Sequence, residues 1–158
     1  MHSDLESHLN QIHLEGVASF LGFYFIALAV MNGVAAYRVW HRKHETGQAI
    51  FWLIVAAFYM GYLAPMSFSA NPKWTPQMPG FIRQFVNDSV GGSTGAVVYT
   101  VGIIIFLSVL YVGRRFFVRG PVAWTMLNLS LLILGLSMAD RFFFAIAAKP
   151  DNVPIVGL

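Results

Sequence analysis

The sequence predicts an all-α integral membrane protein with four transmembrane helices arranged as two antiparallel hairpins. Of its 158 residues, 57% are apolar and only 11% are charged, whereas soluble domains usually carry about 25% charged residues. Four apolar segments are each long enough to cross the bilayer, which takes about 20 residues as a helix. Two of their connections are short, which favours antiparallel neighbours. We therefore expect a single transmembrane domain over residues 1–158.

The first predicted hairpin joins residues 14–40 to residues 49–68 through the polar stretch HRKHETGQ. Pro65, near the end of the second segment, favours a kink there. The chain before the first segment is polar and acidic and lacks the basic region of a cleavable signal peptide. We expect that N-terminal stretch to be retained.

The second predicted hairpin joins residues 96–118 to residues 121–148 through a very short basic turn. Pro121 is a favoured first residue of a helix, because its missing N–H is not needed at that position. The outer loop, residues 69–95, separates the two hairpins. Its first half is rich in proline and is expected to be irregular.

The second half of the outer loop predicts a short amphipathic surface helix. Its apolar residues recur at a helical spacing that places them on one face. They are Phe81, Ile82, Phe85 and Val86. The alternative is a helical cap packed on the protein's own bundle, and the spacing does not choose between them.

Basic residues predict the orientation in the membrane, because short cytoplasmic loops are enriched in Lys and Arg. They concentrate in the two short turns, as Arg38, Arg42, Lys43, Arg114, Arg115 and Arg119. Tryptophan and tyrosine fall near both predicted boundaries, as expected for membrane interfaces. We expect a bacterial-type cytoplasmic (inner) membrane, with both termini on the extracytoplasmic side.

An adjacent acid and base, Asp140 and Arg141, interrupt the last apolar segment. At about 1.5 Å per residue, Pro121 and Asp140 are separated by roughly 28 Å, close to the hydrocarbon thickness. The pair is therefore interpreted as marking the outer interface. The phenylalanines that follow would project beyond the hydrocarbon and need cover.

A partner-contact surface is predicted around this pair and the C-terminal tail. It comprises Asp140, Arg141, Phe142, Phe143, Phe144, Pro150 and Pro154. The prolines of the tail favour an extended chain that ends apolar. Either the tail docks on a neighbouring subunit, or it begins a further segment of a longer protein.

The sequence contains no recognisable catalytic constellation: no nucleophile with a base, no carboxylate pair and no phosphate loop. The chain has no cysteine, which excludes c-type haem attachment and thiolate metal sites. None of its five histidines is expected deep in the membrane, so we expect no haem iron ligated by this chain. His8 and His13 are weak metal-ligand candidates, but a spacing of five places them on different helical faces.

Four polar residues are candidate contacts for a ligand held between helices, such as a quinone or pigment. They are Tyr24, Asn32, Tyr59 and Asn128. Gly22, Ala29 and Gly33 suggest a face that allows another helix to approach closely. We expect no covalently bound cofactor, with lipid, quinone or pigment at helix surfaces.

Three functional hypotheses follow. The leading one is a small, non-catalytic membrane subunit that braces a larger complex, a respiratory or photosynthetic electron-transfer assembly. Its partners would be other membrane subunits and lipids, and not nucleic acid. The second is a quinone- or pigment-binding subunit. The third is a small oligomeric transporter or channel, against which the shortage of deep charges counts.

Overall fold

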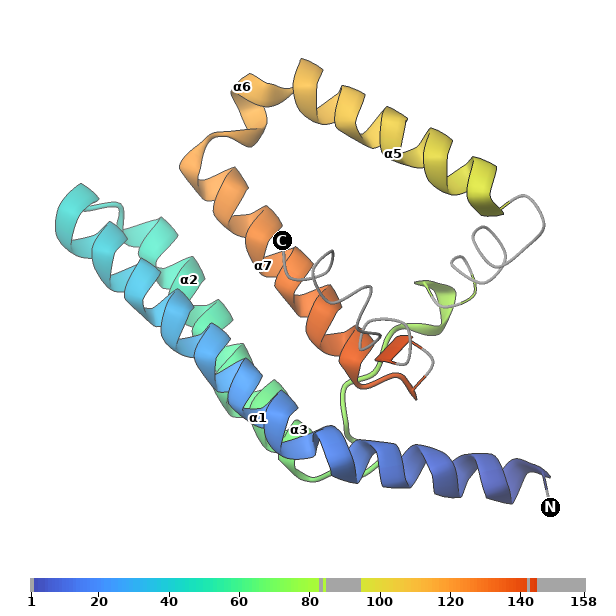
Figure 1. The fold of residues 1–158 in the computed structure, drawn as a ribbon. Helices are drawn as coiled ribbons and strands as arrows, with labels where there is room; N and C mark the ends of the chain where they lie inside the picture. The colour runs from blue at the N-terminus through green and yellow to red at the C-terminus, as the bar shows by residue number, and fades with distance from the viewer. Residues whose placement is uncertain (1, 83, 85–94, 142, 145–158) are drawn as a thin grey trace. The chain divides into compact units, whose positions relative to one another are not determined.

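A computed structural model describes residues 2–82, 84, 95–141 and 143–144 (Figure 1). Every regular element in these ranges is a helix, which confirms the predicted all-helical class. Three helices are long and apolar enough to cross a membrane, namely Ser7–Lys43, Thr46–Phe68 and Gly120–Met138. Thr100–Val112 is a shorter apolar helix. These helices are compatible with a membrane protein, and the two-hairpin arrangement of four spans stays a prediction.

The chain falls into two compact bodies. The first contains residues 1–77 and 134–158, and the second contains residues 78–133. The first body is built on α1 (His2–Lys43) and the helical run that follows it. The second contains α5 (Gly95–Val112), α6 (Arg114–Phe117) and most of α7 (Gly120–Met138).

Helix α1 begins well before the predicted start at residue 14, because the polar N-terminal stretch is itself helical. Its 42 residues correspond to about 63 Å, roughly twice the hydrocarbon thickness. The first part of α1, dark blue in Figure 1, runs at an angle to the remainder. Leu5, Leu9 and Ile12 in this part are all exposed, at the spacing of one apolar helical stripe.

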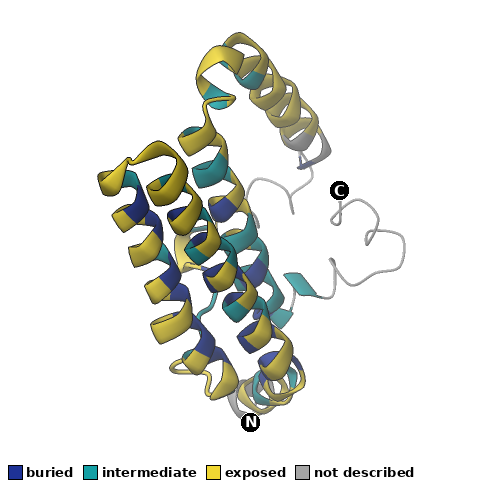
Figure 2. Cartoon of the chain, turned by 90° about the vertical axis from the view of Figure 1, so that its left-hand side faces the viewer, coloured by how far each residue is buried: buried dark blue, intermediate teal, exposed yellow. Residues whose placement is uncertain are grey.

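A continuous helical run returns alongside α1 in the opposite direction (Figures 1 and 2). It comprises α2 (Thr46–Phe58), the π-helical turn η1 (Tyr59–Leu63) and α3 (Ala64–Phe68). Pro65 lacks an N–H and would clash with the carbonyl four residues before it in a regular α-helix. In the wider turn the Ala64 N–H donates to the Tyr59 carbonyl, five residues back. The run therefore continues through the proline.

The core of the first body lies between α1 and this returning run. Figure 2 shows buried residues on the facing sides of the helices and exposed residues on the outer sides. Leu21 and Phe25 of α1 and Trp52 and Tyr59 of the returning run are almost fully buried. Gly22 admits the Phe68 ring, which occupies the space where a Cβ would stand. The face that was predicted to let another helix approach closely therefore makes such a contact at Gly22.

Helix α7 ends at Met138 and does not run uninterrupted to residue 148 as predicted. Residues 139 and 140 form a turn and a bend, after which helix resumes at Arg141. The physical reason lies in Asp140, whose Oδ1 accepts a hydrogen bond from the Phe143 N–H at 3.4 Å. An aspartate that bonds the N–H three residues on is an N-cap, which begins a new helix and ends the previous one. Residues 145–148 lie outside the described residues.

In the second body, α5 ends at Val112, six residues before the predicted end at residue 118. Gly113 leaves the helical conformation, and the ring of Phe117 packs where a Cβ of Gly113 would stand, 2.6 Å away. The basic turn then continues as the separate short helix α6. Of the predicted surface helix, residues 80–82 and 84 are helical, and Phe85 and Val86 lie outside the described residues.

Candidate functional site: an apolar groove beside a basic turn

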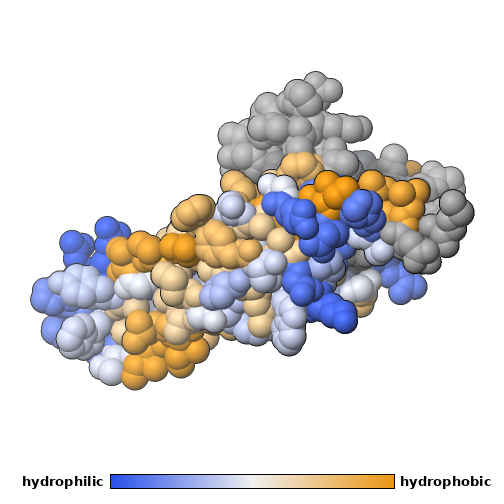
Figure 3. Space-filling model, turned by 90° about the horizontal axis from the view of Figure 1, so that it is seen from below, coloured by the Kyte–Doolittle hydropathy of each residue, from blue (hydrophilic) through white to orange (hydrophobic). Residues whose placement is uncertain are grey.

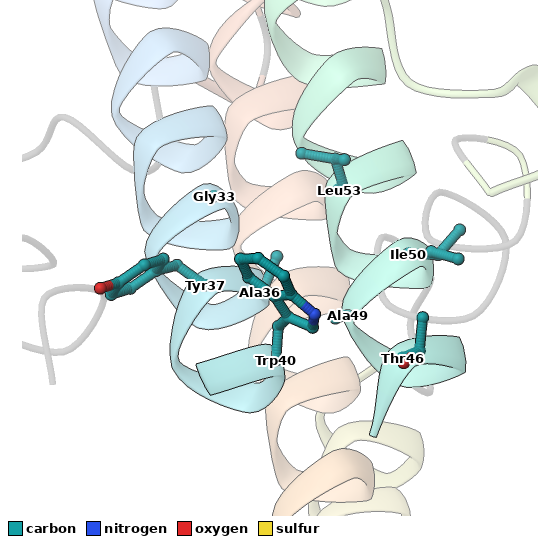
Figure 4. Close-up of a pocket in the computed structure, with 8 residues that line it drawn as sticks. All are labelled: Gly33, Ala36, Tyr37, Trp40, Thr46, Ala49, Ile50 and Leu53. Atoms are coloured by element: carbon teal, nitrogen blue, oxygen red, sulfur yellow. The ribbon is translucent and has the colours of Figure 1, made fainter. Parts of the chain in front are cut away.

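An open groove of about 290 Å³ lies between the end of α1 and the start of α2 (Figure 4). Its lining comes from both helices of the first body. The α1 residues are Gly33, Ala36, Tyr37 and Trp40, and the α2 residues are Thr46, Ala49, Ile50 and Leu53. Six of these eight residues carry no side-chain hydroxyl or charge. The exceptions are the phenol of Tyr37 and the hydroxyl of Thr46, so the lining is mostly apolar.

The groove exists because small residues face large ones across the helix pair. Ala36 and Ala49 are buried where the helices meet, at 6% and 7% exposure. No side-chain or neighbouring-helix atom lies within 4 Å of an ideal Cβ at Gly33, so the space beside this glycine is open. Ile50 and Leu53 stand beside this space and are more than half exposed.

Two aromatic residues shape the end of the groove nearest the turn. Figure 4 shows the Trp40 indole lying between α1 and α2, and the Tyr37 hydroxyl pointing away from the groove. The Tyr37 ring stacks on His41, with ring centres 5.6 Å apart and planes within 7°. The aromatic wall of the groove therefore continues directly into the turn.

The α1–α2 turn is strongly basic and fully exposed. It carries Arg38 and Trp40 on the last turns of α1, followed by His41, Arg42, Lys43 and His44, with Glu45 as its single acid. His44 has φ 55°, the left-handed conformation that reverses the chain between the two helices. Seen from below (Figure 3), hydrophilic side chains gather at this end of the helix pair and again over the first part of α1.

The groove and the turn together present an apolar slot next to fixed positive charge. The slot suits hydrocarbon, which gains free energy on leaving water in proportion to its buried area. The arginines and the lysine of the turn suit phosphate or carboxylate oxygens.

The predicted quinone or pigment contacts do not line this groove. In the first body, Tyr24, Phe25 and Tyr59 instead pack against one another, with successive ring centres 5.5 and 6.1 Å apart. Gly135 of α7 fits against the same rings, since a Cβ there would lie 2.8 Å from Tyr24. Their role as ligand contacts stays a prediction.

Both predicted asparagines are buried and bond to their own helices. The Asn32 side-chain amide donates to the Leu28 carbonyl at 2.9 Å, and that of Asn128 donates to the Trp124 carbonyl at 2.9 Å. Such bonds to the carbonyl four residues back satisfy a polar side chain within one helix. Asn128 belongs to the second body.

The two candidate metal ligands have different surroundings. His13 Nε2 donates to the Met138 carbonyl at 3.1 Å, and its ring lies 5.0 Å from that of Phe144. His8 is exposed. Within the residues that the structure describes, no group of three or more His, Cys, Asp or Glu side chains is placed to hold a metal ion.

The predicted partner-contact residues are only partly described. Asp140 is buried at 3% exposure, and Arg141, Phe143 and Phe144 are partly exposed. The N-cap geometry of Asp140 gives it a structural role, and its depth in the membrane stays a prediction. Phe142, Pro150 and Pro154 lie outside the described residues.

Sequence reasoning did not find the groove. Two signals were present in the sequence. They are the small residues Gly33 and Ala49, which lie on either side of the run of basic residues. What was missing was the distance between the two helices, which depends on tertiary packing. Comparison of the chain with protein-family models, curated proteins and solved structures finds no match.

Proposed function

We propose that this chain is a small, non-catalytic integral membrane subunit that braces a larger multi-subunit membrane complex. The observation that carries the proposal is the surface of α5. Ile104, Ile105, Phe106 and Leu107 are each more than half exposed. Successive residues of a helix point about 100° apart, so these four cover every side of α5. A helix that is apolar all round belongs in lipid or against other protein.

The membrane arrangement we propose makes α5 the fourth span. Its 18 residues correspond to about 27 Å, close to the hydrocarbon thickness of about 30 Å. The two short basic turns would then lie on the cytoplasmic side of a bacterial inner membrane, with both termini on the opposite side. Lipid would cover part of α5 and a partner subunit the remainder.

An electron-transfer assembly of the respiratory or photosynthetic kind is the host we propose. Such assemblies commonly contain helical subunits that ligate no cofactor themselves. The end of α7 gives a second proposed contact surface, because Phe143 and Phe144 remain partly exposed beyond the Asp140 cap. Phe144 is already in contact with His13, so Phe143 is the stronger candidate for a partner contact.

Purification of the tagged chain from its native membrane in mild detergent tests the proposal. Mass spectrometry should find other membrane subunits in fixed ratio, at least one of them carrying a redox cofactor. An alanine scan of α5 should weaken recovery of those subunits along one face only. Phe51→Ala, on the similarly exposed surface of α2, is the matched control and should leave recovery unchanged.

Two results would contradict the proposal. One is a chain that purifies alone at full yield from native membrane. The other is an α5 scan in which no position lowers recovery more than the control does.

A quinone- or pigment-binding subunit is the second candidate. The cluster of Tyr24, Phe25 and Tyr59 supports it, because flat aromatic surfaces suit planar ligands. An absorption spectrum and an organic extract of the purified chain test it. A stoichiometric quinone or pigment lost on Tyr24→Ala, but kept in Tyr62→Ala, would support this candidate over a purely bracing role.

A further inference from the structure

We propose that the α1–α2 groove and its basic turn hold a single anionic phospholipid, with one acyl chain in the groove and the phosphate among the cations of the turn. This inference concerns the first body alone. It requires α1 and α2 to lie in a membrane but does not depend on a partner complex.

The size and lining of the groove fit one acyl chain. Its volume of about 290 Å³ lies at the lower end of the range of about 300–1,000 Å³ that is usual for ligand sites. A slender chain fits such a slot better than a large ring system does. Ile50 and Leu53 leave the groove open along its side, so a lipid can enter laterally from the bilayer.

The positive charge of the turn determines which lipid headgroup binds at that end of the groove. Arg38, Arg42 and Lys43 lie within a few residues of the α1 residues that line the groove, with Glu45 as the single acid in the turn. Guanidinium groups bind phosphate oxygens bidentately, and an ammonium group adds a point charge. Trp40 lines the groove and is followed along the chain by His41, Arg42 and Lys43. Tryptophan favours the level where hydrocarbon meets headgroups.

The net positive charge of the turn distinguishes an anionic lipid from a zwitterionic one. Each Lys or Arg near a membrane surface favours an anionic lipid by about fivefold. Removal of two of the cations should therefore lower the preference by at least about tenfold. Free phosphate would use the turn but not the groove, so it should compete poorly with a lipid.

The test uses the full-length chain reconstituted in equal amounts of phosphatidylglycerol and phosphatidylcholine. After transfer to mild detergent, native mass spectrometry counts the retained lipids. We expect one phosphatidylglycerol per chain, retained about tenfold or more over phosphatidylcholine. Addition of millimolar inorganic phosphate should not displace it.

Two variants with matched controls distinguish the contribution of the groove to lipid retention from that of the charge of the turn. Gly33→Leu fills the open space in the groove and should abolish retention, whereas Gly16→Leu, also in open space on α1, should not. The double variant Arg42→Gln with Lys43→Gln should keep a lipid but lose the preference for phosphatidylglycerol. The same change at Arg114 and Arg115, in the other basic turn, should leave the preference intact.

The proposal is overturned if the wild-type chain retains no lipid, or retains both lipids equally. It is also overturned if Gly33→Leu, with helix content equal to wild type, retains lipid as Gly16→Leu does. Displacement by inorganic phosphate would reduce the site to a simple anion site. If Gly33→Leu fails to fold, the lipid preference of the wild-type chain still tests the proposal.

Discussion

Asp140 shows at the scale of one residue how a charge can serve a structural purpose inside an apolar run. Its side chain is buried, and its Oδ1 accepts from the Phe143 N–H. Its own N–H donates to the Ser137 carbonyl, and its carbonyl accepts from the Phe144 N–H at 2.8 Å. The acid thus closes one helical segment and begins the next.

Two replacements of Asp140 should distinguish the effect of its capping hydrogen bond from the effect of its negative charge. Asp140→Ala removes the acceptor and should lower the free energy of unfolding by about 1 kcal/mol, the usual effect of losing a cap. Asp140→Asn keeps an acceptor and should remain within a few tenths of wild type, since asparagine caps equally well. Unfolding in detergent, followed by circular dichroism, measures both. Equal losses for Asn and Ala would show that the negative charge is what matters.

Gly22 of α1 packs closely against Phe68 of α3. The Phe68 ring fills the space beside it, and this ring also packs edge-on against Phe23 at 5.4 Å. Gly22→Leu should force the ring outward and lower the free energy of unfolding by about 1–3 kcal/mol, as overpacking does. Gly16→Leu, which meets open space, is the control for adding a leucine to α1. Similar stabilities of the two variants in the same detergent would rule out this packing role.

The first part of α1 has an exposed apolar surface that suits the membrane interface. Leu5, Leu9 and Ile12 form an exposed apolar stripe, while Ser7 and Gln11 lie on other sides of the helix. A helix with one apolar and one polar side lies in the plane of the membrane surface. The amphipathic surface helix was predicted in the 69–95 loop, but the described residues show such a pattern most fully at the N-terminus.

Site-specific labels test this orientation, because the chain has no native cysteine. A fluorophore attached at Leu9→Cys should be shielded from a water-soluble quencher once the chain is in vesicles. The same fluorophore at Ser7→Cys, which is exposed on the opposite side of the helix, should be quenched readily. Equal quenching at both positions would mean that the segment does not lie against the membrane.

The parts of this fold that sequence predicts well are those that depend on local composition. Apolar length indicated four helices able to cross a membrane, and three helices among the described residues are long and apolar enough to do so. The break at residues 139–140 was missed because Asp140 was weighed as a charge and not as a cap. The π-helical turn before Pro65 was missed as well, since a kink was the expected response to proline and the chain widened its helix instead.

The candidate site was less predictable than the elements that form it. Tyr24, Asn32 and Tyr59 were chosen as ligand contacts because they are polar groups in apolar helices. In the structure they engage their own helix or neighbouring rings. The groove depends on Gly33 and Ala49 lining it from two helices at a set separation, and this separation follows from the packing of many core residues together.

At the scale of the whole molecule, the proposed bracing role depends on how often the chain crosses the bilayer. The first body supplies a helix pair with its own core, while α5 presents apolar side chains on every side. If α5 crosses the membrane, both basic turns lie on one side, and the connection between α3 and α5 lies on the other. The proposed bracing role requires that arrangement, because an apolar span in the membrane offers a surface to neighbouring subunits.

The most direct measurement is the sidedness of three single cysteines, placed at Arg42, Lys73 and Arg115. Each variant is expressed in cells and treated with a membrane-impermeant maleimide, in right-side-out and in inverted vesicles. Four spans predict that Arg42→Cys and Arg115→Cys react only in inverted vesicles, and Lys73→Cys only in right-side-out ones. Labelling of Lys73→Cys and Arg115→Cys from the same side would show that α5 does not cross the membrane and would contradict the account.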